Sequence, residues 1–144
     1  MATVLDVARY ILDKQGSMTA MKLQKLTYYS KAWHLVWEEQ SLFPDRIEAW
    51  ANGPVSPLLY SAHRGKFRVE PAEIQGNTEA LTDVEKESID SVLGFYGEMR
   101  AMELSELTHR EDPWKCTRDG LPMGASSNAV ITEATLAEYY GALV

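Results

Sequence analysis

Apolar residues recur through the first 39 positions with the period of an α-helix. One stripe occupies positions 4, 7, 8, 11 and 12, and Gly16 is placed to end that helix. A second run, Thr19–Glu39, is apolar on more than one side, and one of its stripes passes through Trp33 and Trp37. A helix of that kind is packed by neighbours on several sides. The sequence therefore predicts a central core helix with both tryptophans inside the protein.

The period changes after residue 40. Positions 46–51 alternate polar and apolar side chains, which predicts a short strand. Asn52-Gly53-Pro54 follows as a tight turn, in which Gly53 allows backbone angles closed to other residues and Pro54 fixes the exit. Ser56 and Pro57 are placed to cap and begin a helix that ends at Gly65. A further short strand is expected around residues 67–69.

The second half of the chain predicts three more helices. Thr82 and Glu85 form a capping box that opens the first of them, and its apolar stripe runs to Met99. A short helix carries Leu104 and Leu107 and is broken at residues 112–114, and residues 116–128 have the composition of a loop. The last helix spans 133–141. The chain thus predicts one mainly α domain over residues 1–144, with about six helices around a central apolar helix and a small β element at 46–51.

Composition sets the class of protein. The chain has 144 residues, of which 45% are hydrophobic, enough for one domain with its own core. Its single cysteine, Cys116, forms no internal disulfide and fits a reducing compartment. The N-terminus lacks the apolar run of a signal peptide, and no stretch approaches the ~20 apolar residues of a membrane helix. We expect a cytoplasmic protein that does not contact the membrane and holds no metal or cofactor.

The net charge of −7 is confined to one segment. Between Glu79 and Asp112 the chain has ten acidic and three basic residues, whereas the remainder has eleven of each. A nucleic-acid binder usually carries a basic stripe, so this balance favours a basic protein partner and makes nucleic acid an unlikely one. The alternative is that the acidic helix faces are simply solvated.

Candidate chemistry is sparse. The sequence has no glycine-rich phosphate loop, no paired-cysteine metal motif and no nucleophile elbow. We expect His34 to be packed, His63 to be exposed and His109 to hydrogen-bond across the turn before Pro113. An enzyme whose site combines His109 with Glu111 and Asp112 remains one alternative function.

A DNA-binding regulator is a second alternative. The first two helices have the spacing of a helix-turn-helix, and the second carries four polar side chains suited to a major groove, Lys22, Gln24, Lys25 and Lys31. Two tryptophans and several aliphatic residues share that helix. It is therefore too apolar for a typical recognition helix.

Three strings of residues resemble the signatures of the Panacea domain, in that family's order. They are Met21–Leu35 (MKLQKLTYYSKAWHL), Ile47–Val55 (IEAWANGPV) running on to Tyr60, and Leu104–His109 (LSELTH) with Pro113-Trp114 after it. The resemblance spans about Val4 to Tyr140. Asn52 departs from the pattern, since the family commonly has an aromatic residue there.

The resemblance implies a mainly helical antitoxin of a bacterial or prophage toxin–antitoxin pair. Such a protein binds a cognate toxin and neutralises it directly or delivers it to a cellular protease, and no catalytic residues come with the resemblance. Four residues are predicted partner contacts: Trp50, Tyr60, Glu103 and Glu106. Five are predicted to define the fold: Trp33, Gly53, Pro54, His109 and Trp114.

Overall fold

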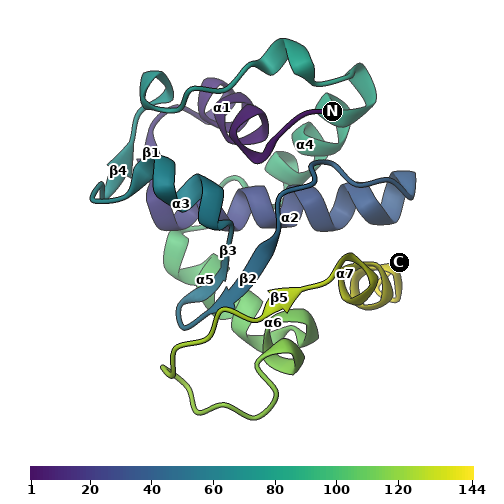
Figure 1. Cartoon of the computed structure of the whole chain (residues 1–144). Coiled ribbons are helices and arrows are strands. Elements are labelled where there is room, and N and C mark those ends of the chain that lie inside the picture. The colour runs from purple at the N-terminus through teal and green to yellow at the C-terminus, as the bar shows by residue number, and fades with distance from the viewer.

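The computed structural model describes all residues, 1–144, and is mainly helical, as the sequence predicted (Figure 1). In chain order the elements are α1 (Val4–Gln15), β1 (Met18–Thr19), α2 (Ala20–Glu38), β2 (Ile47–Trp50), β3 (Gly53–Val55), α3 (Pro57–His63), β4 (Arg68–Val69), the 3₁₀ turns η1 (Pro71–Glu73) and η2 (Thr78–Ala80), α4 (Asp83–Tyr96), α5 (Ala101–Arg110), α6 (Asp112–Thr117), β5 (Val130–Ile131) and α7 (Glu133–Gly141). No helix is long and apolar enough to cross a membrane.

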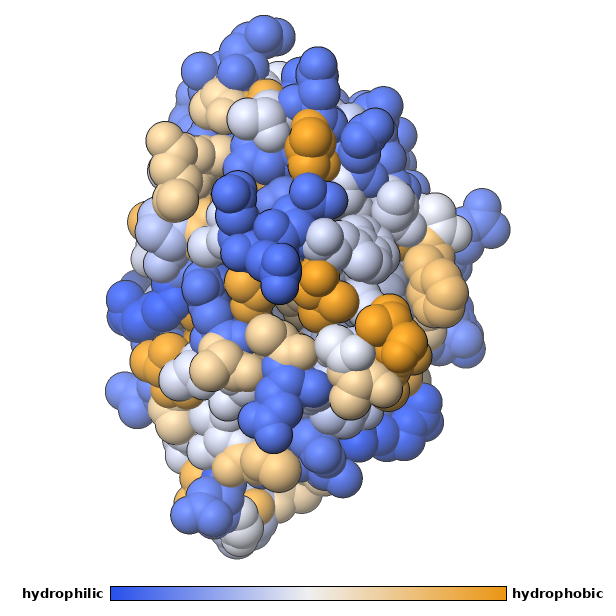
Figure 2. All heavy atoms as spheres, turned by 90° about the vertical axis from the view of Figure 1, so that its right-hand side faces the viewer, coloured by the Kyte–Doolittle hydropathy of each residue, from blue (hydrophilic) through white to orange (hydrophobic).

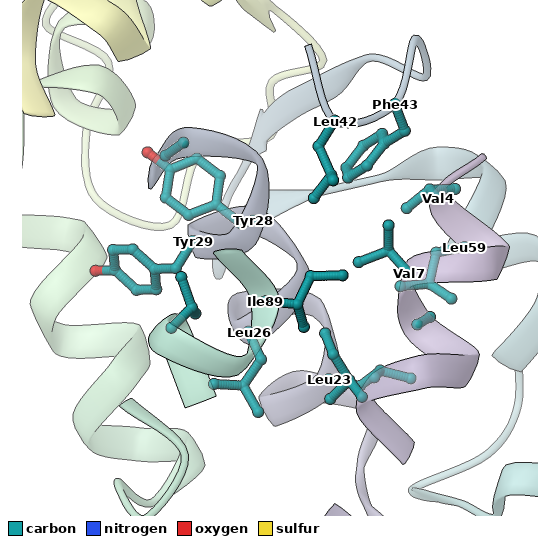
Figure 3. Packing of buried hydrophobic residues seen from close by; sticks show 14 of the residues in the cluster. Val4, Val7, Leu23, Leu26, Tyr28, Tyr29, Leu42, Phe43, Leu59 and Ile89 are labelled. Atoms are coloured by element: carbon teal, nitrogen blue, oxygen red, sulfur yellow. The ribbon is translucent and has the colours of Figure 1, made fainter. Parts of the chain in front are cut away.

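Helix α2 runs through the middle of the molecule, as predicted from its apolar pattern. It contacts α1 and α4 on one side and α5, α7 and β3 on the other (Figure 1). Twelve of its nineteen residues are buried, including polar ones. Figure 3 shows Leu23 and Leu26 of this helix in one cluster with Val7 of α1 and Ile89 of α4. Each such buried aliphatic side chain contributes about 2 kcal/mol to stability.

A small antiparallel sheet lies against α2 in the order β3-β2-β5. The predicted strand is present as β2, and Trp50 pairs with Gly53 across a hairpin. The turn is therefore Ala51-Asn52, one residue earlier than predicted, and Gly53 and Pro54 belong to β3. β5 pairs with β2 through Ile47 and Ile131 and leads the chain into α7. The predicted strand near residue 68 pairs with β1 in a separate two-stranded sheet.

A seventh helix follows the break that the sequence indicated at residues 112–114. Glu111 is extended, with φ −94° and ψ 144°, which ends α5 at Arg110. Pro113 then occupies the first turn of α6, where its missing N–H costs no hydrogen bond. The prediction of about six helices thus misses one because Pro113, which the sequence indicates as a break, lies in the first turn of a new helix.

Buried hydroxyl groups join α2 to the C-terminal helices. Tyr29 and Tyr140 each donate a hydrogen bond of 2.7 Å to the same carboxylate oxygen of Glu111, and the Tyr28 and Tyr140 hydroxyls lie 2.9 Å apart. Burial raises the pKa of Glu111, and the two hydrogen bonds oppose that rise. Tyr96 of α4 stacks on Tyr29 with ring centroids 4.1 Å apart. This cluster fixes α7 against α2 and places the C-terminus beside α4.

Candidate binding surfaces

Two of the predicted contact residues meet at the mouth of a recess. Trp50 of β2 and Tyr60 of α3 pack edge to face, with ring centroids 5.0 Å apart. Both line a recess of about 760 Å³ between the first turns of α2, the β2–β3 hairpin, α3 and the loop around residues 126–128. The two residues are only partly covered, Trp50 being half-buried and Tyr60 exposed. The aromatic side chains therefore form a wall that an incoming group can touch.

The other two predicted contacts lie outside that recess. Glu103 and Glu106 are both exposed on α5, and neither lines the recess. The Glu103 carboxylate accepts a hydrogen bond of 2.8 Å from the backbone N–H of Arg100, and so it caps its own helix. That bond and the Arg100 guanidinium lower the pKa of Glu103. The structure thus separates the predicted contacts into an aromatic pair and an acidic pair.

The predicted fold-defining residues surround the same hairpin, apart from Trp33. The indole N–H of Trp114 donates a hydrogen bond of 2.8 Å to the backbone carbonyl of Trp50. The Trp114 ring stacks on His109 at 4.1 Å, and the guanidinium of Arg118 lies 4.7 Å from the same ring. Trp33 lies elsewhere and donates to the hydroxyl of Tyr96 at 3.0 Å.

Two histidine predictions were wrong. His63 is buried and not exposed, because its Nε2 lies 3.0 Å from the Gln24 amide nitrogen inside the protein. His109 was expected to hydrogen-bond across the turn, but its buried Nε2 has no partner and its ring stacks on Trp114 instead. Burial lowers the pKa of His109, a hydrogen bond with the backbone of Asn52 opposes that shift, and the charge of Lys25 adds to it.

The recess contains a lysine that the sequence suggested only as a DNA contact. Lys25 is 1% exposed, and its ammonium makes neither an ion pair nor a hydrogen bond within the protein. Burial lowers the pKa of Lys25 to about 8. The signal in the sequence was a lysine within a helix that is apolar on more than one side. As a candidate DNA contact, Lys25 was expected on the surface and not inside the protein.

Gly53 makes room for this lysine. Its φ of +126° lies in a region that other residues rarely adopt. A Cβ added at Gly53 would lie 2.6 Å from Cε and 2.9 Å from Nζ of Lys25. Gly53, which the sequence predicts to define the fold, therefore also determines where the lysine lies.

A second surface is an apolar groove at the other end of α2. The groove has a volume of about 600 Å³, and eight of its ten lining residues are hydrophobic: Trp33, Trp37, Val92, Phe95, Tyr96, Leu107, Leu143 and Val144. Trp37 was predicted to be internal but is 42% exposed, since it lies in the last turns of α2 and one side of its ring faces this groove. Phe95 is 79% exposed. Figure 2 shows the side of the molecule that carries the C-terminus, where apolar side chains gather in the middle of a hydrophilic face.

Acidic residues border the groove. An adjoining hollow shares Trp37 and Ser91 with the groove and is lined by Glu38, Glu87 and Asp90. Two of these acids belong to the acidic segment of the sequence, and they lie on α4. The groove therefore has an apolar centre and an acidic edge.

The three residues of the alternative enzyme site do not come together. Glu111 faces the tyrosines of α2 and α7, the exposed carboxylate of Asp112 pairs with Lys115 at 3.9 Å, and His109 stacks on Trp114. Nowhere do three histidine, cysteine or carboxylate side chains gather as metal ligands.

The structure also argues against the helix-turn-helix interpretation, because most of the expected DNA contacts are inaccessible. Of the four polar side chains suited to a major groove, Gln24, Lys25 and Lys31 are buried. Helix α2 is enclosed by its neighbours and presents no recognition face.

Residues 23–115 match the model of a family described as "Antitoxin SocA-like, Panacea domain". Antitoxin SocA of Caulobacter vibrioides (strain NA1000 / CB15N) is 29% identical over 130 residues, which covers 79% of this chain and 69% of that protein. No solved structure matches. The matched range includes Lys25, the β2–β3 hairpin and Trp114, and it ends before α7.

Proposed function

Because the chain belongs to the SocA-like Panacea domain family of antitoxins, we propose that it neutralises a cognate toxin by binding it through the apolar groove. The groove is the one formed by α2, α4 and the C-terminal residues Leu143 and Val144. The partner is a protein, and the interaction takes place in the cytoplasm. A complex of this kind inactivates the toxin by covering its working surface.

The observation that carries this proposal is the exposed apolar centre of the groove. Phe95, Leu143 and Val144 are 79%, 57% and 82% exposed and lie together on one surface. Contiguous exposed apolar groups of this kind mark interaction sites on folded proteins. The acidic edge at Glu38, Glu87 and Asp90 adds the polar rim that surrounds such centres. The toxin segment that fits is an apolar anchor flanked by basic residues.

Contacts within the protein hold the aromatic side chains that form the wall of the groove. Trp33 is held by its hydrogen bond to Tyr96, and Tyr96 stacks on the buried Tyr29. Trp37 stacks on Trp33 with ring centroids 5.6 Å apart. A preorganised aromatic wall loses little conformational entropy on binding, which favours affinity. Docking here would also suit an adaptor that delivers the toxin to a cellular protease.

The test is rescue of bacterial growth. The gene next to this one is induced in a bacterial host with and without this chain, and the pair is purified through a tag on one member. Phe95→Asp places a charge in the groove and is expected to abolish both rescue and co-purification. Phe67→Asp is the matched control, because Phe67 is equally exposed at 80% but lies beside β4. It is expected to leave both unchanged.

The outcomes separate the mechanisms. Rescue with a stable complex that depends on Phe95 supports direct neutralisation at the groove. Rescue without a complex, with toxin that disappears unless the host protease is deleted, supports delivery to the protease. If Phe95→Asp rescues as well as the unaltered chain does, the groove is not the toxin-binding surface.

A further inference from the structure

We propose that the recess at the first turns of α2 binds a ligand that carries one carboxylate, with the ammonium of Lys25 as its counter-ion and Trp50 and Tyr60 as its apolar wall. The recess and the groove share no lining residue, so this site is separate from the proposed toxin-binding surface. The inference does not depend on the toxin.

Lys25 lacks the partners that a buried lysine requires. Lys31, the other buried lysine of α2, donates to the backbone carbonyls of Phe43 and Asp45 at 2.7 and 3.1 Å and pairs with Glu133 at 3.2 Å. Lys25 is more deeply buried and has none of these, and burial alone accounts for its lowered pKa. A buried charge is normally compensated by a counter-ion or hydrogen bonds. A ligand bound in the recess that Lys25 lines would supply the acceptor that this lysine lacks within the protein.

The neighbouring polar groups are already satisfied. The amide of Gln24 bonds the backbone N–H of Ser56 at 2.9 Å and the carbonyl of Ser56 at 3.3 Å, and its nitrogen also faces His63. Glu48 accepts from Arg46 at 2.6 Å and from the Trp50 indole at 2.8 Å. Within this wall, Lys25 is the buried residue whose side chain makes no hydrogen bond to the protein.

The charge balance selects a singly charged ligand. Glu48 is neutralised by Arg46, so Lys25 leaves the recess with one positive charge. One ammonium in a partly desolvated site suits a carboxylate, whereas a phosphate dianion would retain an unpaired charge there.

The size of the recess favours a ligand that carries more than a carboxylate group. The recess of about 760 Å³ is far larger than a carboxylate group, and its outer rim carries Ser126, Ser127 and Asn128. Trp50 and Tyr60 offer apolar contact, and the rim offers hydrogen bonds. Two sources fit this chemistry: the C-terminal end of a peptide and a free aryl or alkyl carboxylic acid.

The experiment follows Lys25 directly by NMR in the full chain with lysine labelled at Cε. Four probes are titrated: an acetylated Ala-Ala-Leu tripeptide with a free carboxylate, the same peptide as its amide, phenylacetate and inorganic phosphate. A carboxylate probe is expected to shift the Lys25 Cε resonance to saturation and to move its pKa from about 8 towards 10.5. Lys25→Met should weaken binding at least tenfold, while Lys22→Met, one turn earlier on the same helix, should not change it.

The probes distinguish the sources. Binding of the free tripeptide but not its amide assigns the site to a peptide end, and binding of phenylacetate alone assigns it to a small acid; either result supports a carboxylate site. The proposal is overturned if no carboxylate moves the Lys25 resonance, if the amide or phosphate binds as tightly, or if folded Lys25→Met binds as well as the unaltered chain.

Discussion

Lys25 is expected to cost the protein stability. Its folded pKa of about 8 lies below the ordinary value of 10.5, so the unfolded chain holds the proton more tightly. The cost is fully present below pH 8 and is lost as the pH rises from about 8 to 10.5. At 1.36 kcal/mol per pKa unit it amounts to about 3 kcal/mol at pH 7. We therefore expect Lys25→Met to raise the free energy of unfolding at pH 7 by up to that amount.

Urea unfolding at pH 7 and pH 10 measures this effect. The gain from Lys25→Met should shrink at pH 10, whereas the half-exposed Lys22, replaced in the same way, should change little at either pH. A loss of stability in Lys25→Met at pH 7 would contradict the cost assigned to the ammonium. A residue kept at such a cost is typical of a functional site.

A second prediction concerns the stability cost of a side chain at Gly53, whose backbone lies against Lys25. Gly53→Ala forces a side chain into a positive φ and brings its Cβ to 2.6 Å from Cε of Lys25. Gly65→Ala has a positive φ of +85° but meets nothing within 4 Å, so it carries the backbone strain alone. We expect about 1 kcal/mol of destabilisation for Gly65→Ala and 2–4 kcal/mol for Gly53→Ala, measured by urea unfolding.

A double substitution isolates the steric part. Gly53→Ala combined with Lys25→Ala removes the clash and should bring the loss caused by Gly53→Ala close to that of Gly65→Ala. Equal losses for Gly53→Ala with and without Lys25 would show that the lysine gives way at no cost.

Among the elements, α7 depends most clearly on a polar contact. Its Tyr140 is buried and bonds both Tyr28 and Glu111, whereas the adjacent Tyr139 is half-buried and its hydroxyl has no hydrogen-bond partner. Tyr140→Phe leaves a buried carboxylate with one donor fewer and should cost about 2–3 kcal/mol. Tyr139→Phe should change the free energy of unfolding by less than about 0.5 kcal/mol.

Hydrogen exchange tests whether that loss is local to α7. Tyr140→Phe should increase exchange of the α7 amides more than those of α1, because α7 is joined to α2 through this hydroxyl. Uniform loss of protection would mean that α7 unfolds only together with the whole core.

The elements with local signals were predicted well. Helices α1, α2, α4 and α7 follow from local signals and apolar periodicity, and Thr82 accepts the backbone hydrogen bond expected of its capping box. Helix α6 was missed because the break at Pro113 predicts only the end of a helix, whereas Pro113 lies in the first turn of the next one. Strand β3 was missed because its three residues have no period and depend on pairing with β2.

The two surfaces could not be predicted from local pattern. Trp50 and Tyr60 were selected as contacts, and the structure does bring them together, but the recess behind them depends on the approach of α2 and the 126–128 loop. The groove combines residues from α2, α4 and the C-terminus. Trp37 was predicted to be internal because its stripe is apolar, but it lies in the last turn of α2 and is 42% exposed.

At the scale of the whole molecule, α2 connects the recess, which contains the Lys25 ammonium, with the apolar groove, which has an acidic edge. Lys25 lies near its start and Trp37 near its end, twelve residues or about 18 Å apart along the axis. Between them lies the tyrosine cluster, which is buried and fully packed. Substitutions at one surface should therefore leave the other intact, which is why Phe95→Asp and Lys25→Met can be interpreted separately.

The net charge of −7 gives a prediction for the rate of toxin binding. Acids at the edge of the groove attract a basic toxin during its approach, and dissolved salt screens that attraction. Stopped-flow or surface-binding measurements should show the association rate constant falling about tenfold from low to high salt, with a smaller change in dissociation. Glu87→Lys, at the groove, should slow association more than Glu70→Lys, which lies next to β4. A rate that is independent of salt would mean that the acidic segment serves solubility alone, and that the apolar groove selects its partner without electrostatic help.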